Sequence, residues 1–176
     1  VWGNTSSGGQ PQHPSGSTTR SSTSAGTDRS VPRFMGRRKF GPQAGPWTDD
    51  EWCGWWGDEP PFETTVFVMT HYPRPTIDFA NGTSFHFVDG APEEVLALAR
   101  EAAGGKDVRI GGGPTTVREF LSAGLVDVMQ VVLVPLVLGR GVSLWEGLEG
   151  LEDGDDVESI PSATTGVMHL IFRRKA

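Results

Sequence analysis

Residues 108–121, VRIGGGPTTVREFL, decide the fold class of this chain. A short β-branched run ends at Ile110, three glycines follow, and an amphipathic pattern begins at Pro114. This order predicts a strand, a tight turn and the start of a helix, because proline suits the first helical turn. Glycines carry no Cβ, and the free N–H groups of a helix start attract anions. The stretch therefore predicts a site for a phosphate-bearing ligand.

The same alternation of strands and helices continues on both sides of this stretch. Short runs rich in β-branched and aromatic residues predict strands at 64–70, 84–88, 107–110, 126–134 and 165–174. Apolar residues at helical spacing predict helices at 92–103 and 115–123. Strands separated by helices are typical of a parallel sheet with helical crossovers. The almost entirely apolar run at 126–134 predicts a strand that is covered on both faces.

Composition limits the class of protein. A chain of 176 residues predicts one folded domain, here at 33–176, preceded by a low-complexity leader at 1–32 that we expect to be disordered. The net charge of −7 argues against general nucleic-acid binding, and the longest apolar run, 131–138, is too short to cross a membrane. One cysteine, Cys53, excludes an internal disulfide and favours a cytoplasmic location.

Tryptophans and acidic residues mark the segments between the predicted strands. Trp52, Trp55 and Trp56 have the spacing of one helical turn, so they either fasten a loop over the core or offer a surface for a partner or a ring. The acidic runs at 49–63 and 146–158 predict solvated loops. No pair of histidines has the spacing of metal ligands, and we predict no metal site.

Three predicted strand ends carry groups suited to an anion. They are Gly36–Arg38 with two guanidiniums, 70–74 with a hydroxyl, an imidazole and a guanidinium, and the glycine turn at 111–116. Ligands of open parallel sheets bind at the carboxyl ends of the strands. We expect these three segments to meet at one edge of the sheet.

Four stretches resemble the dihydrofolate-reductase-like family: MGRRKFGP at 35–42, VFVMTHYPRP at 66–75, the long run from Asp107 to Gly141, and the closing strand. The similarity covers about residues 34–174 and is closest to the branch of the riboflavin-biosynthesis reductase C-terminal domain and its bacterial relatives of unassigned substrate. It implies an α/β fold with a mixed, mostly parallel sheet, flanking helices and an antiparallel C-terminal strand. It also implies NADPH as cofactor and hydride transfer to a small heterocyclic substrate.

The resemblance assigns cofactor contacts to individual residues. Gly111 and Gly112 would hold the diphosphate, with a cis peptide bond between them, and Gly113, Thr115 and Thr116 would complete the helix start beneath it. The remaining assignments fall on the two other strand ends. Gly36, Arg37 and Arg38 would lie on the phosphate side, and Thr70 with His71 or Arg74 would meet the adenosine 2′-phosphate.

One departure from the family affects the substrate side. The family begins with a strand and loop that contact the nicotinamide and the substrate, and here the leader stands in their place. We therefore expect a gap in the sheet and assign no catalytic residue. Two alternatives stay open beside a reductase: a catalytically silent NADPH-binding module, and an oligomerisation module in which residues 126–138 and the last strand pair across a homodimer.

Overall fold

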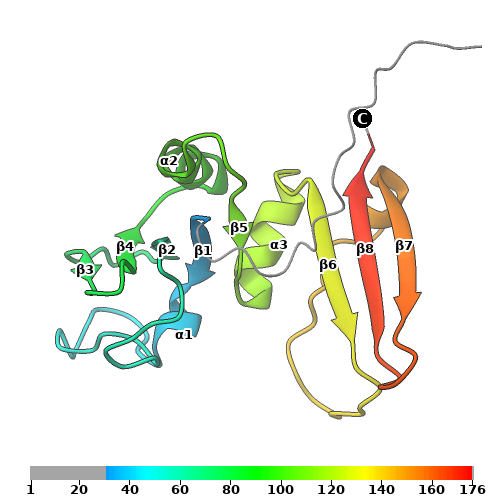
Figure 1. Cartoon of the computed structure of the whole chain (residues 1–176), viewed down its shortest axis with the longest axis horizontal. Coiled ribbons are helices and arrows are strands. Elements are labelled where there is room, and N and C mark those ends of the chain that lie inside the picture. Colours follow the sequence, from blue (N-terminus) through cyan, green and yellow to red (C-terminus); the bar gives the residue numbers. More distant parts are fainter. Residues whose placement is uncertain (1–30, 176) are drawn as a thin grey trace, which may run out of the picture.

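The computed structural model describes residues 31–175, and its strands form two sheets (Figure 1). The first sheet has the order β3-β4-β2-β1-β5, and the second has the order β6-β8-β7. The strands of the first sheet are β1 (Arg33–Gly36), β2 (Thr65–Met69), β3 (Ile77–Asp78), β4 (Ser84–Val88) and β5 (Arg109–Ile110). The second sheet contains β6 (Val128–Leu133), β7 (Asp155–Pro161) and β8 (Met168–Arg174). The helices are α1 (Arg37–Phe40), α2 (Pro92–Ala103), α3 (Pro114–Ser122) and the 3-10 turn η1 (Leu151–Gly154).

Strand directions confirm the predicted fold class. Strand β1 pairs in parallel with β2 and β5, and β2 pairs in parallel with β4, whereas β3, β6, β7 and β8 make antiparallel pairs. The predicted helix at 92–103 is α2, and α3 begins at Pro114, one residue before the predicted start. Most of the predicted leader lies outside the described residues. Of its last two residues, Val31 is buried and the Pro32 carbonyl accepts a bond from the Arg109 amide at 2.9 Å.

Local sequence explains where α2 begins and ends. Pro92 opens the helix, and the Glu94 carboxylate accepts a hydrogen bond from the amide of Ala91 at 3.2 Å. Gly104 ends it with a left-handed backbone, φ 55°, which glycine adopts without a steric penalty. Within residues 31–175, no helix is both long and apolar enough to span a bilayer.

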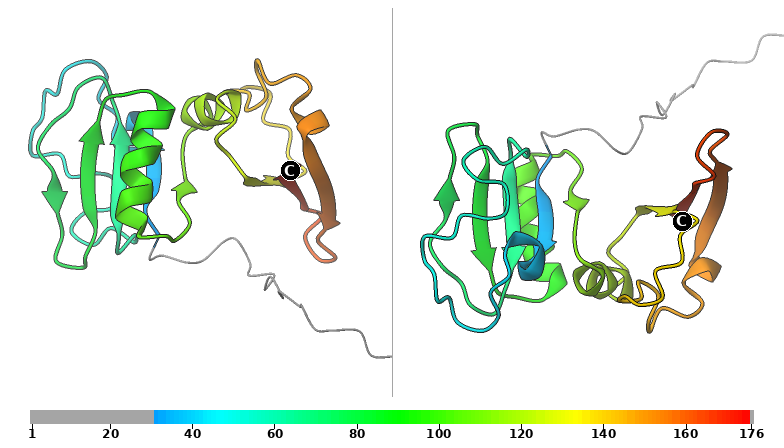
Figure 2. Two further views of the ribbon diagram at one scale, coloured as in Figure 1. Left: turned by 90° about the horizontal axis from the view of Figure 1, so that it is seen from above. Right: turned by 90° about the horizontal axis from the view of Figure 1, so that it is seen from below.

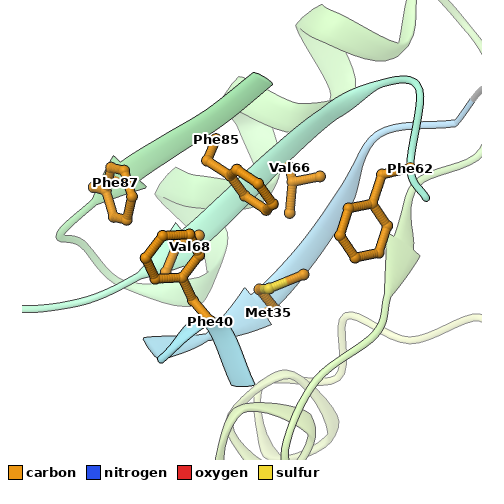
Figure 3. Close-up of a cluster of buried hydrophobic side chains, with 7 residues drawn as sticks. All are labelled: Met35, Phe40, Phe62, Val66, Val68, Phe85 and Phe87. Atoms are coloured by element: carbon orange, nitrogen blue, oxygen red, sulfur yellow. The ribbon is translucent and has the colours of Figure 1, made fainter. Parts of the chain in front are cut away.

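The first sheet is buried on both faces because apolar side chains alternate along its strands. In β1, Phe34 points to one face and Met35 to the other. The helix α2 covers the face of Phe34 (Figure 2), and Phe120 of α3 packs into the same cluster. On the opposite face, shown in Figure 3, the buried cluster comprises Met35, Phe40, Phe62, Val66, Val68, Phe85 and Phe87.

The tryptophan-rich segment lies over this second cluster. Trp47, Trp52 and Trp56 pack against it, which supports the interpretation that they fasten a loop over the core. Trp55 is 56% exposed and makes an edge-to-face contact with Trp52. The predicted helical turn is wrong, because residues 50–57 form turns and irregular loop instead of a helix. The segment contains two glycines with positive φ, Gly54 and Gly57, which oppose helix formation.

Two other predictions are also wrong. Strand β6 is not covered on both faces: Val128, Val132 and Leu133 are 46–52% exposed, because the helices α2 and α3 pack against the first sheet. The acidic run at 146–158 is not all loop, because its last residues enter β7 and pair with β8. The expected gap in the sheet lies between β5 and β6, the facing edge strands of the two sheets.

Phe34 joins three elements, so its removal is expected to destabilise the fold strongly. It is fully buried, and its ring lies 5.6 Å from Phe67 and 5.0 Å from Phe120. Phe34→Ala should lower the free energy of unfolding by about 3–5 kcal/mol. Leu98→Ala is the control, because Leu98 is 49% exposed on α2 and should lose less than about 1 kcal/mol. Urea denaturation measures both, and equal losses would contradict this account of the core.

Gly36 marks the close approach of the β1 end to the start of α3. A Cβ on Gly36 would lie 2.5 Å from the Oγ1 of Thr116, which is buried. Gly36→Ala should therefore destabilise the protein by about 1–3 kcal/mol, and Thr116→Ala should recover part of this loss in the double variant. Gly154→Ala is a matched control, because a Cβ there meets nothing within 4 Å. Strictly additive effects of Gly36→Ala and Thr116→Ala would show that the two segments do not touch.

Candidate functional site

The order of the first sheet brings the three predicted strand ends together. Strand β1 lies between β2 and β5, and all three run parallel, so their carboxyl ends share one edge. The segments Gly36–Arg38, 70–74 and 111–116 follow these ends directly. Figure 1 shows α1 and α3 at the corresponding ends of β1 and β5. The predicted residues form two groups at this edge.

The first group surrounds the glycine turn, Gly111–Gly113. The amide of Gly111 donates to the carbonyl of Phe34 at 2.9 Å, which fixes the turn against β1. Gly113 has φ 78° and lies exposed, and Thr115 is exposed beside it. The first hydrogen bond of α3 runs from the amide of Val117 to Gly113 at 3.1 Å. The helix amides that precede Val117 have no intrahelical acceptor, so they remain available to an anion.

The surroundings of Gly112 differ from those expected for a residue that holds a phosphate. It is buried, and a Cβ on it would lie 3.0 Å from Cγ2 of Val117. Tight packing against α3 therefore disfavours a side chain at this position. The expected cis bond between Gly111 and Gly112 is wrong, because every described peptide bond is trans. A non-proline cis bond costs roughly 2.5–4 kcal/mol, and a trans bond avoids this cost.

Lys39 also reaches the glycine turn, from α1. Its Nζ donates to the carbonyl of Gly111. Burial lowers the pKa of Lys39 below its usual range, and the nearby positive charges of Arg109 and Arg33 lower it further. Lys39 was not among the residues predicted for the site. Its position directly after Arg37 and Arg38 was a signal that a longer basic run enters the site.

The second group is an arginine–aromatic cluster of Arg37, Trp47, Tyr72 and Arg74. The Arg37 guanidinium lies 3.8 Å from the centre of the Trp47 ring and 5.4 Å from that of Tyr72, and it donates to the carbonyl of Gly45. Its Nε and Nη2 are buried without a hydrogen-bond partner. Burial lowers the pKa of Arg37, and the charge of Arg74 acts in the same direction while Tyr72 opposes it. Arg37 thus keeps unused donor capacity at the edge of the sheet.

Arg74 is engaged with the tryptophan-rich segment. Its guanidinium donates to the carbonyls of Trp52, at 3.2 Å, and Asp50, and it stacks on Trp47 at 4.8 Å. Arg74 also lines a depression of about 340 Å³ with Asp50, Pro75, Thr76 and Ile77, none of which belongs to the glycine turn. A phosphate would therefore have to compete with these backbone carbonyls for Arg74.

Thr70 and His71 occupy the end of β2 beside the end of β4. The Thr70 hydroxyl accepts a bond from the amide of Tyr72 at 3.1 Å and so stabilises the turn. His71 is 91% exposed, and its Nδ1 lies 2.9 Å from a carboxylate oxygen of Asp89. Arg38 is exposed on α1. The positions of Trp47, Tyr72 and Asp89 in this site were not predicted, because the contacts join segments that lie far apart in the sequence.

Histidines and acidic residues do not assemble into a metal centre in the described part of the chain, where no three potential ligands cluster. His86 lies on β4 and shares a hydrogen bond with Ser84 at 2.8 Å. His169 lies on β8, 3.2 Å from the Gln130 amide nitrogen. Both are strand histidines with local partners.

Structural comparisons support the fold. A riboflavin biosynthesis protein described as putative, from Shewanella sp. PV-4, matches with a TM-score of 0.56 and 23% identity, over 84% of this chain and 76% of its own. Dihydrofolate reductase from Enterococcus faecalis, solved with NADP(H) and RAB-propyl, matches with a TM-score of 0.56 and 17% identity, over 84% of this chain and 77% of its own. At these identities the likeness concerns the fold. The comparison with curated protein sequences found no match.

The family is shown by the sequence itself. The family model for the RibD C-terminal domain matches residues 46–159, which include β2 to β6, the glycine turn and α3. This match spans more than half of the chain and agrees with the resemblance found in its motifs. The chain belongs to the RibD C-terminal domain family.

Proposed function

We propose that this chain is an NADPH-dependent reductase domain that acts on a small heterocyclic substrate of the pteridine or aminopyrimidine class. The nearest named activities would be those of 5-amino-6-(5-phosphoribosylamino)uracil reductase and dihydrofolate reductase. The observation that carries the proposal is the meeting of the glycine turn with Gly36, Arg37 and Lys39 at one edge of the sheet. The use of NADP(H) by the Enterococcus structure of the same fold supports the choice of cofactor.

The residues at this edge fit a dinucleotide phosphate in three respects. The start of α3 offers amides without intrahelical acceptors, and Gly113 and Thr115 leave the approach open. Arg37 has two buried donor atoms without partners, and a phosphate oxygen would satisfy them. When bound, the cofactor would supply the hydride, and this chain would hold and orient it. We place the activity in the cytoplasm, on the basis of the single exposed cysteine.

We assign the adenosine 2′-phosphate to Thr70 with His71 or Arg74, and Asp89 is the residue that should weaken its binding. The Asp89 carboxylate engages His71 and would repel a phosphate brought to the same place. Asp89→Asn should therefore tighten NADPH binding a few-fold and leave NADH binding unchanged. Glu158→Gln, on β7, is the control with the same change in net charge.

Fluorescence titration with NADPH and with NADH measures these affinities, and an NADPH oxidation assay with aminopyrimidine and pteridine substrates tests turnover. Binding with turnover supports the reductase. Binding without turnover supports the silent cofactor-binding module instead. If the wild-type protein binds neither nucleotide, both cofactor proposals are wrong.

A second candidate function, homodimerisation, is favoured by the exposure of β6 and the segment after it. Leu136, Val137 and Leu138 are 70–100% exposed, in continuation of the half-exposed valines and leucine of β6. An unpaired strand edge with exposed apolar side chains is a template for pairing. We propose that two copies pair antiparallel through β6 about a two-fold axis.

Light scattering over a dilution series tests this dimer. The mass should double at high concentration, and Val132→Lys should keep the protein monomeric because it places a charge on the β6 edge. Leu98→Lys is the matched control, since Leu98 is similarly exposed but lies on α2. A monomeric wild-type protein at every concentration would refute the dimer and leave the cofactor proposal standing.

A further inference from the structure

Lys39 stands in a position that its structural contacts do not fully explain. The Nζ donates to the carbonyl of Gly111, so a long, flexible side chain from α1 ends on the glycine turn. A Cβ on Gly111 would lie 3.7 Å from this Nζ, which places the ammonium directly against the turn. The amide of Gly111 also donates a hydrogen bond to the carbonyl of Phe34, so the turn has another contact with β1.

The charge of Lys39 is held in an unfavourable place. Its ammonium is partly withdrawn from water and is near the cations Arg33, on β1, and Arg109, on β5. These two arginines are paired in register on adjacent strands. Both effects lower the pKa of Lys39, so this position favours the protonated side chain less than bulk water does. A positive charge kept under these conditions is typical of a site that binds an anion.

We propose that Lys39 is the cation that binds the diphosphate of the dinucleotide, and that its bond to the Gly111 carbonyl is the ligand-free position of the same side chain. This inference rests on the proposed function, which it deepens by naming a residue. The other cations of the site bond away from the glycine turn: Arg37 donates to Gly45 and keeps two donor atoms for a phosphate, and Arg74 donates to Asp50 and Trp52. The Lys39 stem can rotate from the carbonyl to a phosphate oxygen, because an ammonium on four methylenes has no fixed bonding plane.

Two measurements on one variant distinguish a binding role of Lys39 from a structural role. Lys39→Met should weaken NADPH binding by about tenfold, the size expected for one charge-assisted contact, and should reduce the dependence of binding on salt. The same variant should not lower the urea midpoint of the ligand-free protein at pH 7, because it relieves repulsion from Arg33 and Arg109. A structural lysine predicts the reverse: loss of stability with affinity unchanged.

The matched control is Lys175→Met. Lys175 Nζ also donates to a backbone carbonyl, that of Asp153 at 2.9 Å, and it follows β8, in the second sheet. This variant removes the same charge from the same kind of bond, so it should leave NADPH affinity unchanged. An equal loss of affinity in both variants would show a general charge effect and would overturn the assignment of Lys39.

A pH series gives an independent readout. Wild-type affinity for NADPH should fall at alkaline pH, once Lys39 loses its proton, and the fall should begin below the pH at which an ordinary lysine titrates. Lys39→Arg keeps the charge at all these pH values, so its affinity should not show this fall. If the wild-type protein binds NADPH and Lys39→Met binds equally well, the Lys39 proposal fails alone. If the wild-type protein binds no NADPH, this proposal and the proposed function fail together.

Discussion

The pairing of β1 with β5 is the constraint on which the site depends. It spans two residue pairs, Arg33 with Arg109 and Phe34 with Ile110, and is extended by backbone bonds of 2.9 Å on either side. The second of these hydrogen bonds, from the amide of Gly111 to the carbonyl of Phe34, fixes the position of the glycine turn along β1. Because α1 follows β1 directly, the same pairing brings Lys39 to the turn and Gly36 to Thr116. A ligand site built from two short strands gains its rigidity from the aromatic core beneath, where Phe34 contacts both Phe67 and Phe120.

Charge is distributed unevenly in this acidic protein. The edge that carries the glycine turn holds Arg37, Lys39 and Arg74, although the chain as a whole has a net charge of −7. Desolvation lowers the pKa values of Arg37 and Lys39 from those of an ordinary arginine and lysine, and Arg74 adds a third basic side chain to this edge. A positive edge on a negative molecule attracts a multiply charged anion to one place and repels it from the rest. Asp89, beside His71, is the local exception, and it lies on the side assigned to the 2′-phosphate.

The sequence predicted the parts of the fold that local chemistry determines. Pro92, Glu94 and Gly104 define α2, and the apolar runs at 65–69 and 84–88 became paired strands. Elements whose structure depends on tertiary contacts were not predicted. The acidic strand β7 forms because β8 offers a complementary edge with Arg173. The Trp52–Trp56 spacing did not produce a helix. In the site, the strand ends were predicted from sequence order, but the enclosure of Arg37 by Trp47 and Tyr72 joins segments 35 residues apart and leaves no local pattern. Gly112 shows that one glycine signal can arise from helix packing as well as from a ligand.

The absence of pairing between β5 and β6 in the described chain affects the proposed hydride transfer more than it affects cofactor binding. All the proposed phosphate contacts belong to the first sheet, to α1 and to the start of α3, so binding of the dinucleotide does not require the second sheet to be joined to the first. Hydride transfer is more demanding, because donor and acceptor carbons must be held about 3–3.5 Å apart in one orientation. In the described chain no strand bridges β5 and β6, and the apolar side chains of β6 lie half exposed at that edge. In the proposed reductase, cofactor affinity would therefore depend on the edge of the first sheet, whereas turnover would depend on how the substrate side is closed when the substrate binds.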